Sequence, residues 1–262
     1  MDTITCDLRR DLLSELECPV CTEYMLPPIL FCVNGHNICP NCKPKLKQCP
    51  TCRQPFVNIR NVALEKMARQ IEYPCSYWRY GCRKKVNLDI KNKHERVCPY
   101  NQYSCPLTKV PAVKCSWRGR LADLKKHITT VHSEWSHEYK GSFITGLVDI
   151  MPSRRYCYII FAYDEIFYRY FSVKNGNFWG VLQYIGPKEN AAKFRYKVTF
   201  DNNNDAGSIT ICQVTRSFEE SMDDIRDTGK CIKLHYDVVK NFVNSKNNLK
   251  FQMEIFRNDD KV

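Results

Sequence analysis

Seven cysteines and one histidine near the N-terminus have the residue types and spacing of zinc ligands. They are Cys18, Cys21, Cys32, His36, Cys39, Cys42, Cys49 and Cys52, all within 35 positions. Two cysteines separated by two residues can bind one zinc ion from a single tight turn, and a tetrahedral site then needs two more ligands. The eight residues therefore predict two zinc sites, each closed to water and structural.

Other modules with C-x2-C pairs offer alternatives: a zinc ribbon, a LIM-like pair of sites, or a thioredoxin-type redox motif. The redox alternative fits worst, because the pairs lie among further ligands and outside a β-α-β pattern. The order C-x2-C-x10-C-x3-H-x2-C-x2-C-x6-C-x2-C resembles the RING finger of ubiquitin ligases. The pairs interleave in that family, which implies one zinc on Cys18, Cys21, Cys39 and Cys42, and a second on Cys32, His36, Cys49 and Cys52.

Two further groups of ligands follow the RING-like segment. Their orders are C-x6-C-x11-H-x3-C, made by Cys75, Cys82, His94 and Cys98, and C-x9-C-x11-H-x4-H, made by Cys105, Cys115, His127 and His132. The closing pair of each group is about one helical turn apart and can share a helix face. His137 could replace His132, but the shared eleven-residue spacer favours His132. Four zinc ions are expected in total.

Nucleic-acid binding is a minor alternative. The chain has a formal net charge of +12, but four zincs and the twelve thiolates that would hold them lower this to about +8. A DNA-reading finger has cysteines two to four residues apart, whereas six and nine residues separate them here. The basic residues around Arg83 and Lys125 are then solvated faces.

The elements that position these ligands change in type along the chain. Residues 61–72 predict a short helix with Asn61 at its start, and its apolar side chains, which should pack against a zinc module, are Leu64, Met67, Ala68 and Ile71. Period-two alternation, as in 194–200, predicts half-buried strands. The strand candidates lie near 156–163, 166–173, 178–185, 194–200, 208–215 and 249–255, with a turn at 202–204 and a helix at 236–242. An all-β antiparallel sandwich is their natural packing.

The remaining cysteines and histidines form no catalytic group. Cys157, Cys212 and Cys231 suit small apolar core positions, Cys6 stands apart, and His235 is alone. A sandwich without an active site can bind an extended peptide by strand addition, or it can be purely structural or dimerising. The first residues lack the apolar core of a signal peptide, and no run of 18 apolar residues occurs, so we expect a soluble protein without membrane contact. Its expected location is the cytoplasm, with nuclear access left open.

The complete order resembles the Seven in absentia (SINA/SIAH) ubiquitin ligases. The strings that carry the resemblance are CPVCTEYMLPPILFCVNGHNICPNCKPKLKQCPTCR, NIRNVALEKMA, YPCSYWRYGC, CSWRGRLADLKKHITTVH and WGVLQYIG. It implies small zinc-held α+β modules followed by a TRAF-like sandwich: an N-terminal tail at 1–17, a RING finger at 18–53, a connecting helix at 54–73, tandem fingers at 74–133 and the sandwich at 138–262. The nine-residue spacer between Cys105 and Cys115 is three residues longer than the family leads us to expect, an insertion that a flexible loop tolerates.

The resemblance also implies partners and a mechanism. The RING would hold a ubiquitin-charged conjugating enzyme and act by proximity, with no covalent ubiquitin intermediate. Residues at the positions of the enzyme-contacting surface are Val20, Ile29, Leu46 and Pro50, although ordinary packing is an alternative for Ile29. Arg53 would bridge ubiquitin and the enzyme, or is simply an exposed basic residue. The sandwich would form homodimers and capture degron peptides near 143–149 and 155–161, leading to proteasomal degradation. A scaffold without ligase activity is the alternative function.

Overall fold

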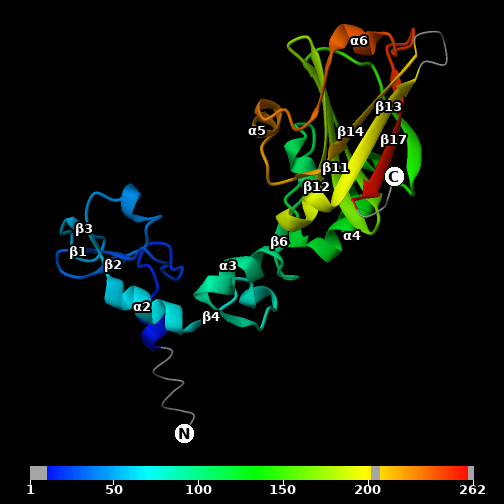
Figure 1. Ribbon diagram of the computed structural model, residues 1–262. Coiled ribbons are helices and arrows are strands. Elements are labelled where there is room, and N and C mark those ends of the chain that lie inside the picture. The colour runs from blue at the N-terminus through cyan, green and yellow to red at the C-terminus, as the bar shows by residue number, and fades with distance from the viewer. Residues whose placement is uncertain (1–10, 202–206, 259–262) are drawn as a thin grey trace. The chain divides into compact units, whose positions relative to one another are not determined.

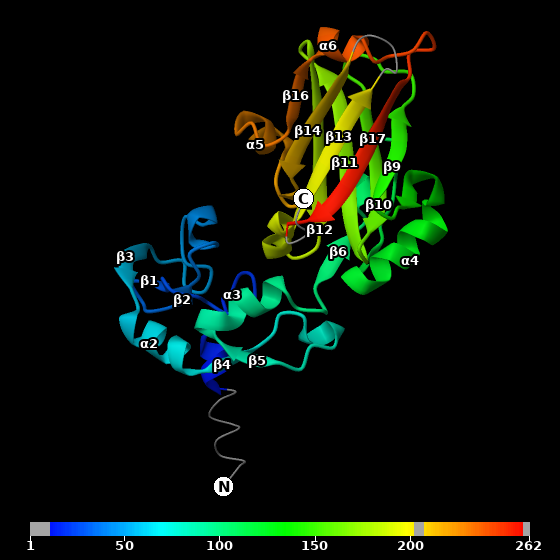
Figure 2. The same cartoon turned by 45° about the vertical axis from the view of Figure 1, so that its right-hand side comes forward.

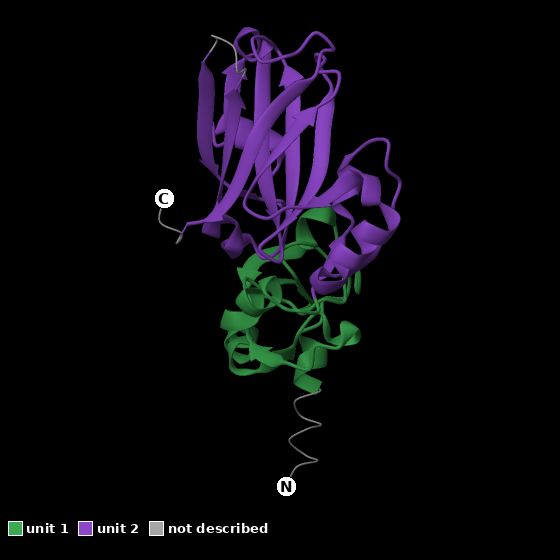
Figure 3. Cartoon of the chain, turned by 90° about the vertical axis from the view of Figure 1, so that its right-hand side faces the viewer, with its two compact units in different colours: residues 1–100 green, residues 101–262 purple. Residues whose placement is uncertain are grey.

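The computed structural model describes residues 11–201 and 207–258, which form two compact units divided after Tyr100 (Figure 3). Unit 1 contains the RING and the first finger, and unit 2 contains the second finger and the sandwich. The predicted segment 74–133 is thus shared between the units. Cys6, most of the predicted N-terminal tail and the predicted turn at 202–204 lie outside the described residues.

The RING of unit 1 is built on a small antiparallel sheet in the order β2-β1-β3, seen at the blue end of the chain in Figure 1. The strands are β1 (Leu30–Cys32), β2 (Asn37–Ile38) and β3 (Phe56–Arg60). Helix α2 (Val62–Gln70) follows, and the side chain of Asn61 caps it by accepting a hydrogen bond from the Leu64 N–H at 3.1 Å. Ala68 of α2 packs into the RING core, but Met67 is exposed, so the predicted apolar stripe is only partly buried.

Each finger consists of a β-hairpin and a helix. The first finger contains β4 (Glu72–Pro74), β5 (Lys85–Asn87) and α3 (Leu88–Arg96), and the second contains β6 (Gln102–Ser104), β7 (Arg118–Arg120) and α4 (Leu121–Val131). Five short 3-10 helices lie at Lys43–Lys45, Trp78–Tyr80, Pro106–Lys109, Ser133–Trp135 and Lys188–Lys193. This arrangement places the last two ligands of each group at the end of a helix.

The sandwich has two layers. Its larger sheet has the order β15-β12-β11-β10-β8, with β16 also on β12. The smaller sheet has the order β14-β13-β17-β9, which can be followed in Figure 2. The strands of the larger sheet are β8 (Ser136–Glu138), β10 (Arg155–Ala162), β11 (Glu165–Lys174), β12 (Asn177–Ile185), β15 (Arg216–Ser217) and β16 (Ile232–His235). Those of the smaller sheet are β9 (Ser142–Leu147), β13 (Phe194–Asp201), β14 (Ser208–Val214) and β17 (Leu249–Arg257). All six predicted strands are confirmed, and the fold is mostly antiparallel, with short parallel pairs β8/β10 and β12/β15.

Both faces of the larger sheet have packed apolar side chains. One face meets the smaller sheet through residues such as Phe167 and Phe171, and the other meets the second finger, where Leu124 and Ile128 of α4 join Ile159 in one cluster. Helix α6 (Tyr236–Lys240) confirms the helix predicted at 236–242, whereas the sequence did not predict α5 (Met222–Asp227). Among the described residues, no helix is long and apolar enough to cross a membrane.

Candidate functional site

The eight RING ligands converge in two groups. Cys18, Cys21, Cys39 and Cys42 form one, and Cys32, His36, Cys49 and Cys52 form the other, with the ligand atoms of each group within 4.8 Å of one another. The pairs are interleaved along the chain, as the family resemblance implies. Each zinc would therefore tie together two segments that are far apart in sequence, which suits a scaffold role.

The distances within the RING groups fit zinc. The Sγ atoms of Cys21 and Cys39 are 3.9 Å apart, and the Cys32 Sγ is 3.6 Å from the Cys52 Sγ and 3.5 Å from the His36 Nδ1. A tetrahedral zinc lies about 2.3 Å from each sulfur, which spaces the sulfurs roughly 3.8 Å apart. Four protein ligands fill the coordination shell, so these zincs would hold shape and bind no reacting water.

The fingers supply two more groups of the same kind. Cys75, Cys82, His94 and Cys98 form one in unit 1, and Cys105, Cys115, His127 and His132 form one in unit 2. The Cys75 and Cys98 sulfurs are 3.8 Å apart, and the Cys82 sulfur is 3.5 Å from the His94 Nε2. The long spacer between Cys105 and Cys115 thus still returns both thiols to one group, and the four expected zinc sites are all present as ligand sets.

His132, and not His137, completes the last group. The His132 Nε2 is buried and has no hydrogen-bond partner among the described residues, which would be costly unless a metal binds it. His137 lies on β8, is exposed and pairs with Ile160 of the sheet. The neighbouring ligand His127 is held by Trp117, whose ring stacks on the imidazole at 4.6 Å. A zinc ion would satisfy the otherwise unpaired nitrogen.

Backbone turns aim the thiols at the metal positions. The N–H of Thr22 donates to the Cys18 carbonyl at 2.9 Å, and the N–H of Arg53 donates to the Cys49 carbonyl at 2.8 Å. Thr22 and Arg53 both adopt positive φ values, of 58° and 61°, which close these turns tightly after the second cysteine. The side chain of Arg53 is exposed, and among the described residues it has no ion-pair or hydrogen-bond partner. It is free to contact another protein.

Three of the four residues expected to contact a conjugating enzyme are accessible. Val20 is 44% exposed, Pro50 is exposed and Leu46 is half-buried. Ile29 is 0% exposed and packs in the RING core with Leu16, so its assignment as a contact is corrected to core packing. Val20 and Pro50 lie within C-x2-C turns, between Cys18 and Cys21 and between Cys49 and Cys52.

The segments expected to bind a peptide lie in different sheets. Segment 143–149 contains most of β9, which ends the smaller sheet, and 155–161 lies in β10 of the larger sheet. On the β9 segment, Ile144 and Val148 are 63% and 70% exposed. An edge strand has unpaired backbone groups, and exposed apolar side chains beside it suit an added strand.

Between these segments a cation is buried without a carboxylate. Arg169 of β11 is 5% exposed and donates to the Thr145 Oγ1 of β9 at 2.7 Å. Its guanidinium carbon lies 5.2 Å, 5.7 Å and 5.9 Å from the ring centres of Tyr158, Phe171 and Phe251. Burial lowers the pKa of Arg169 from its usual value to about 10. The cation is held chiefly by ring faces.

Comparison with known proteins identifies the family. Three protein-family models match, namely the E3 ubiquitin-protein ligase sina/sinah RING finger at 18–52, the Sina zinc finger at 66–143 and the Sina TRAF-like domain at 160–254. The E3 ubiquitin-protein ligase sina of Drosophila melanogaster is 30% identical over 246 residues, covering 90% of this chain and 76% of the fly protein. This chain belongs to the sina/siah family of RING-type E3 ubiquitin-protein ligases.

A second relative shares a smaller part of its length with this sina/siah chain. The E3 ubiquitin-protein ligase siah-1 of Caenorhabditis briggsae is 37% identical over 208 residues, which are 75% of this chain but 47% of the nematode protein. The order of modules in the sina/siah chain agrees with the three family models, and the cysteine and histidine groups fall within the first two matched regions.

One positioning residue of the sina/siah RING is not visible in its sequence. Glu65 of α2 is 4% exposed and accepts hydrogen bonds from the Ile29 N–H at 2.9 Å and the Arg60 Nε at 3.0 Å. The Arg60 guanidinium holds the pKa of the Glu65 carboxyl below its usual value. Glu65 therefore fastens α2 to β3 and to the chain before β1. A charged residue beside an apolar stripe gives no sequence signal of this role.

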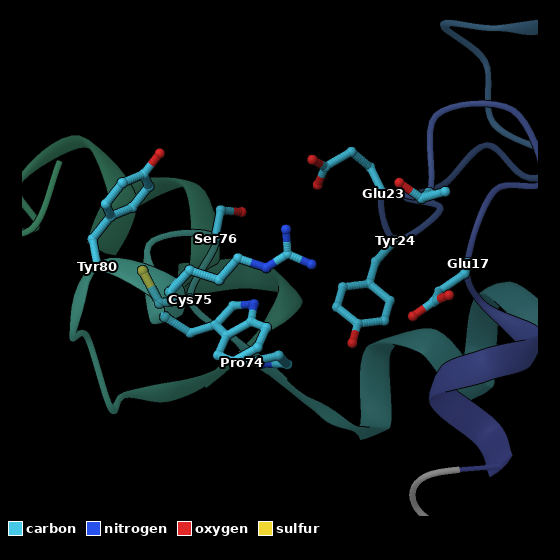
Figure 4. Close-up of a pocket in the computed structure, with 10 residues that line it drawn as sticks. Glu17, Glu23, Tyr24, Pro74, Cys75, Ser76 and Tyr80 are labelled. Atoms are coloured by element: carbon cyan, nitrogen blue, oxygen red, sulfur yellow. The ribbon is translucent and has the colours of Figure 1, made fainter. Parts of the chain in front are cut away.

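A cleft of about 580 Å³ lies within unit 1 between the RING and the first finger (Figure 4). Glu17, Glu23 and Tyr24 line its RING side, and Ser76 and Tyr80 line its finger side. Burial, with the carboxylates of Glu17 and Glu23, raises the pKa of Tyr24, so its phenol stays protonated at neutral pH. The cleft contains no ligand of the two RING groups.

Proposed function

We propose that this sina/siah E3 ubiquitin-protein ligase holds a ubiquitin-charged conjugating enzyme on its RING while the sandwich holds a substrate peptide. The observation that carries the first half is that Val20 and Pro50 are exposed and Leu46 is half-buried, while the exposed side chain of Arg53 has no partner among the described residues. Ubiquitin would pass directly from the enzyme's thioester to a substrate lysine. On this mechanism the gain in rate comes from proximity and orientation, and not from a covalent intermediate on the ligase.

Arg53 has the chemistry for the bridging role. A guanidinium has five N–H donors in a planar arrangement and can bond two partner proteins at once. The backbone bond from Arg53 to Cys49 fixes the start of this side chain beside the zinc-binding turn. We therefore propose that Arg53 bonds ubiquitin and the conjugating enzyme together, restricting the thioester to a reactive orientation.

Substrate binding is proposed for the β9 edge of the sandwich. Among the described strands, the backbone of β9 pairs on one side only, with β17. An extended peptide could add to its free side, with the exposed side chains of Ile144 and Val148 giving selectivity. Proteasomal degradation of the substrate and homodimerisation through unit 2 complete the proposal, on the family resemblance alone.

A discharge assay tests the ligase half. The purified, zinc-loaded chain is mixed with a panel of ubiquitin-charged conjugating enzymes, and loss of the thioester is followed. Loss of one charge-assisted hydrogen bond at Arg53 should slow discharge roughly tenfold in Arg53→Ala. Cys39→Ser, which breaks one zinc group, should abolish it, and Arg83→Ala, an exposed arginine in the first finger, should leave it unchanged.

If Arg53→Ala and the wild type each bound four zinc ions and discharged ubiquitin at equal rates, Arg53 would have no role in the mechanism. If the wild type discharged none of the conjugating enzymes in the panel, the scaffold alternative would be favoured. The substrate half is tested separately by selecting peptides on the full chain and comparing their binding to Ile144→Glu, which should weaken it. Peptides that bind the variant and the wild type equally would exclude the β9 edge.

A further inference from the structure

A small cationic pocket lies in unit 2 on the face of the larger sheet that is turned away from the smaller sheet. It has a volume of about 190 Å³ and is lined by Ser153, Arg155, Tyr170, Ser172, Lys174 and Arg226. Arg155 comes from β10, and its cross-strand partner in β11 is Ser172. Arg226 comes from α5, which lies beside the sheet (Figures 1 and 2). Neither the zinc groups nor the β9 edge include these residues.

The pocket has an excess of positive charge. Arg155 and Lys174 are exposed at its rim, and in the described part of the chain neither forms an ion pair with a carboxylate. Arg226 pairs with Asp223 at 3.1 Å, but the Asp223 side chain is 84% exposed and screened by solvent. Three cations thus face one small cavity with a single, weak counter-charge.

The floor of the pocket is organised by Arg226. Its NH2 group donates to the Tyr170 hydroxyl at 3.0 Å and is 3.4 Å from the Ser172 Oγ. A hydroxyl oxygen that accepts a guanidinium N–H directs its own proton away from that cation, so both hydroxyls can donate to a ligand in the pocket. Tyr170 and Ser172 are 6% and 3% exposed, and no other hydrogen bond of these hydroxyls occurs within the described residues.

Two further features fix the geometry. The Arg226 guanidinium carbon lies 5.7 Å from the Tyr170 ring and 5.9 Å from the Trp179 ring, and its Nε is buried without a hydrogen-bond partner. Ser153 has φ of 64°, a conformation uncommon for a residue with a side chain, and its N–H donates to the Val173 carbonyl at 2.7 Å. The turn before β10 is therefore fastened to β11 at the rim of the pocket.

We propose that this pocket binds the phosphate group of a phosphoserine or phosphothreonine side chain in a partner protein. A phosphate monoester has close to two negative charges and three strong acceptor oxygens at neutral pH. Arg155 and Lys174 complement the charge at the rim, and the Tyr170 and Ser172 hydroxyls complement the oxygens below. The pocket adds a second, phosphorylation-dependent contact to the sandwich.

The arrangement of the three cationic side chains favours a phosphorylated peptide over a nucleic acid. Nucleic-acid backbones carry regularly spaced phosphates and are bound by extended basic tracks, often with aromatic faces for the bases. Here the three cations converge on one cavity of about 190 Å³, which admits a single headgroup and its short stem. The Trp179 ring is already covered by Lys233, at 5.1 Å, and by Arg226.

The test is a binding experiment that does not require ligase activity. The full, zinc-loaded chain is presented with a library of peptides centred on phosphoserine or phosphothreonine and with the same library unphosphorylated. We expect selective retention of phosphorylated peptides and competition by inorganic phosphate. The double variant Arg155→Gln and Lys174→Gln should weaken binding at least about tenfold, since two charge-assisted contacts are lost. Both residues are exposed, so the fold should persist.

The matched control is Lys250→Gln, which neutralises an exposed lysine on β17 of the other sheet and should change nothing. Three results would overturn the proposal: equal retention of the two libraries, equal weakening by the control and the double variant, or a preference for single-stranded RNA or anionic vesicles over phosphopeptides. Because the readout is binding alone, it is independent of the outcome of the discharge assay.

Discussion

Replacing Arg169 should test how the sandwich tolerates a buried cation. Arg169 lies between the sheets, 5% exposed, and forms no ion pair within the described residues. A buried charge that lacks an opposite charge normally destabilises the folded state. We expect Arg169→Met, which keeps a long side chain but removes the charge, to leave the sandwich as stable as the wild type or more stable.

The magnitude follows from the pKa. Burial lowers the pKa of Arg169 from its usual value to about 10. Because each pKa unit corresponds to about 1.4 kcal/mol, keeping the charge costs about 3 kcal/mol. Because the folded pKa is the lower one, this cost applies at neutral pH and is relieved only as the pH rises through the folded pKa. The ring faces of Tyr158, Phe171 and Phe251 and the bond to Thr145 offset part of it. The expected net gain in Arg169→Met is about 0–3 kcal/mol.

Hydrogen exchange measures this locally. Unfolding of the whole chain need not be two-state, because it has two units, whereas the exchange of β11 and β12 amides reports the opening of the sandwich itself. Arg169→Lys is the informative control. It keeps a charge but replaces the planar guanidinium with a strongly hydrated ammonium that stacks poorly, so it should be clearly less stable than Arg169→Met.

A loss of more than about 1 kcal/mol in Arg169→Met would refute this reasoning, because the contacts with rings and Thr145 would then outweigh the desolvation cost. If the lysine variant matched the wild type, the geometry of the guanidinium would be irrelevant to its burial.

Two other predictions concern the zinc modules. His132→Ala should lower the zinc content of the purified chain from four ions to three while His137→Ala keeps four, as counted by atomic absorption; identical contents would contradict the ligand set. Glu65→Gln should destabilise unit 1 by about 1–3 kcal/mol, since the Ile29 N–H and Arg60 lose a charged acceptor. The pKa of Glu65 is lowered below its usual 4.5, so the wild type's advantage should be constant above that pH and shrink as the pH falls further. Urea unfolding of both proteins at matched zinc content measures the difference in their free energies of unfolding. If this difference stayed the same as the pH fell, the ion pair between Glu65 and Arg60 would be ruled out.

The zinc chemistry was readable from the sequence because metal ligands need particular residue types at particular spacings. The interleaving of the RING pairs was not, since spacing alone allows several pairings, and it came from the family resemblance. The choice between His132 and His137 was settled by structure: one imidazole is buried with an unpaired nitrogen and the other lies on an exposed strand. Regular spacing predicted the right residue here.

Exposure was the least predictable property. Val20 and Ile29 are both apolar residues of the RING, yet one is 44% exposed and the other 0% exposed, because Ile29 precedes β1 and packs in the core. Period-two alternation found β13 and β17, which have one buried face, but it was weaker in β10 and β11, where the second finger covers the other face. Tertiary packing, and not local pattern, decides these positions.

Strand β11 has polar side chains on both faces although it is buried along nearly its whole length. Its side chains alternate between the sheets and the outer face, so Arg169 points toward β9 while Tyr170 and Ser172 point toward the cationic pocket. The mean hydropathy of the strand includes Phe167 and Phe171, so it does not reveal the polar residues between them. Because the polar groups lie on opposite faces, neither contacts the other's partners. The peptide edge proposed at β9 and the phosphate pocket proposed beside α5 can therefore change independently.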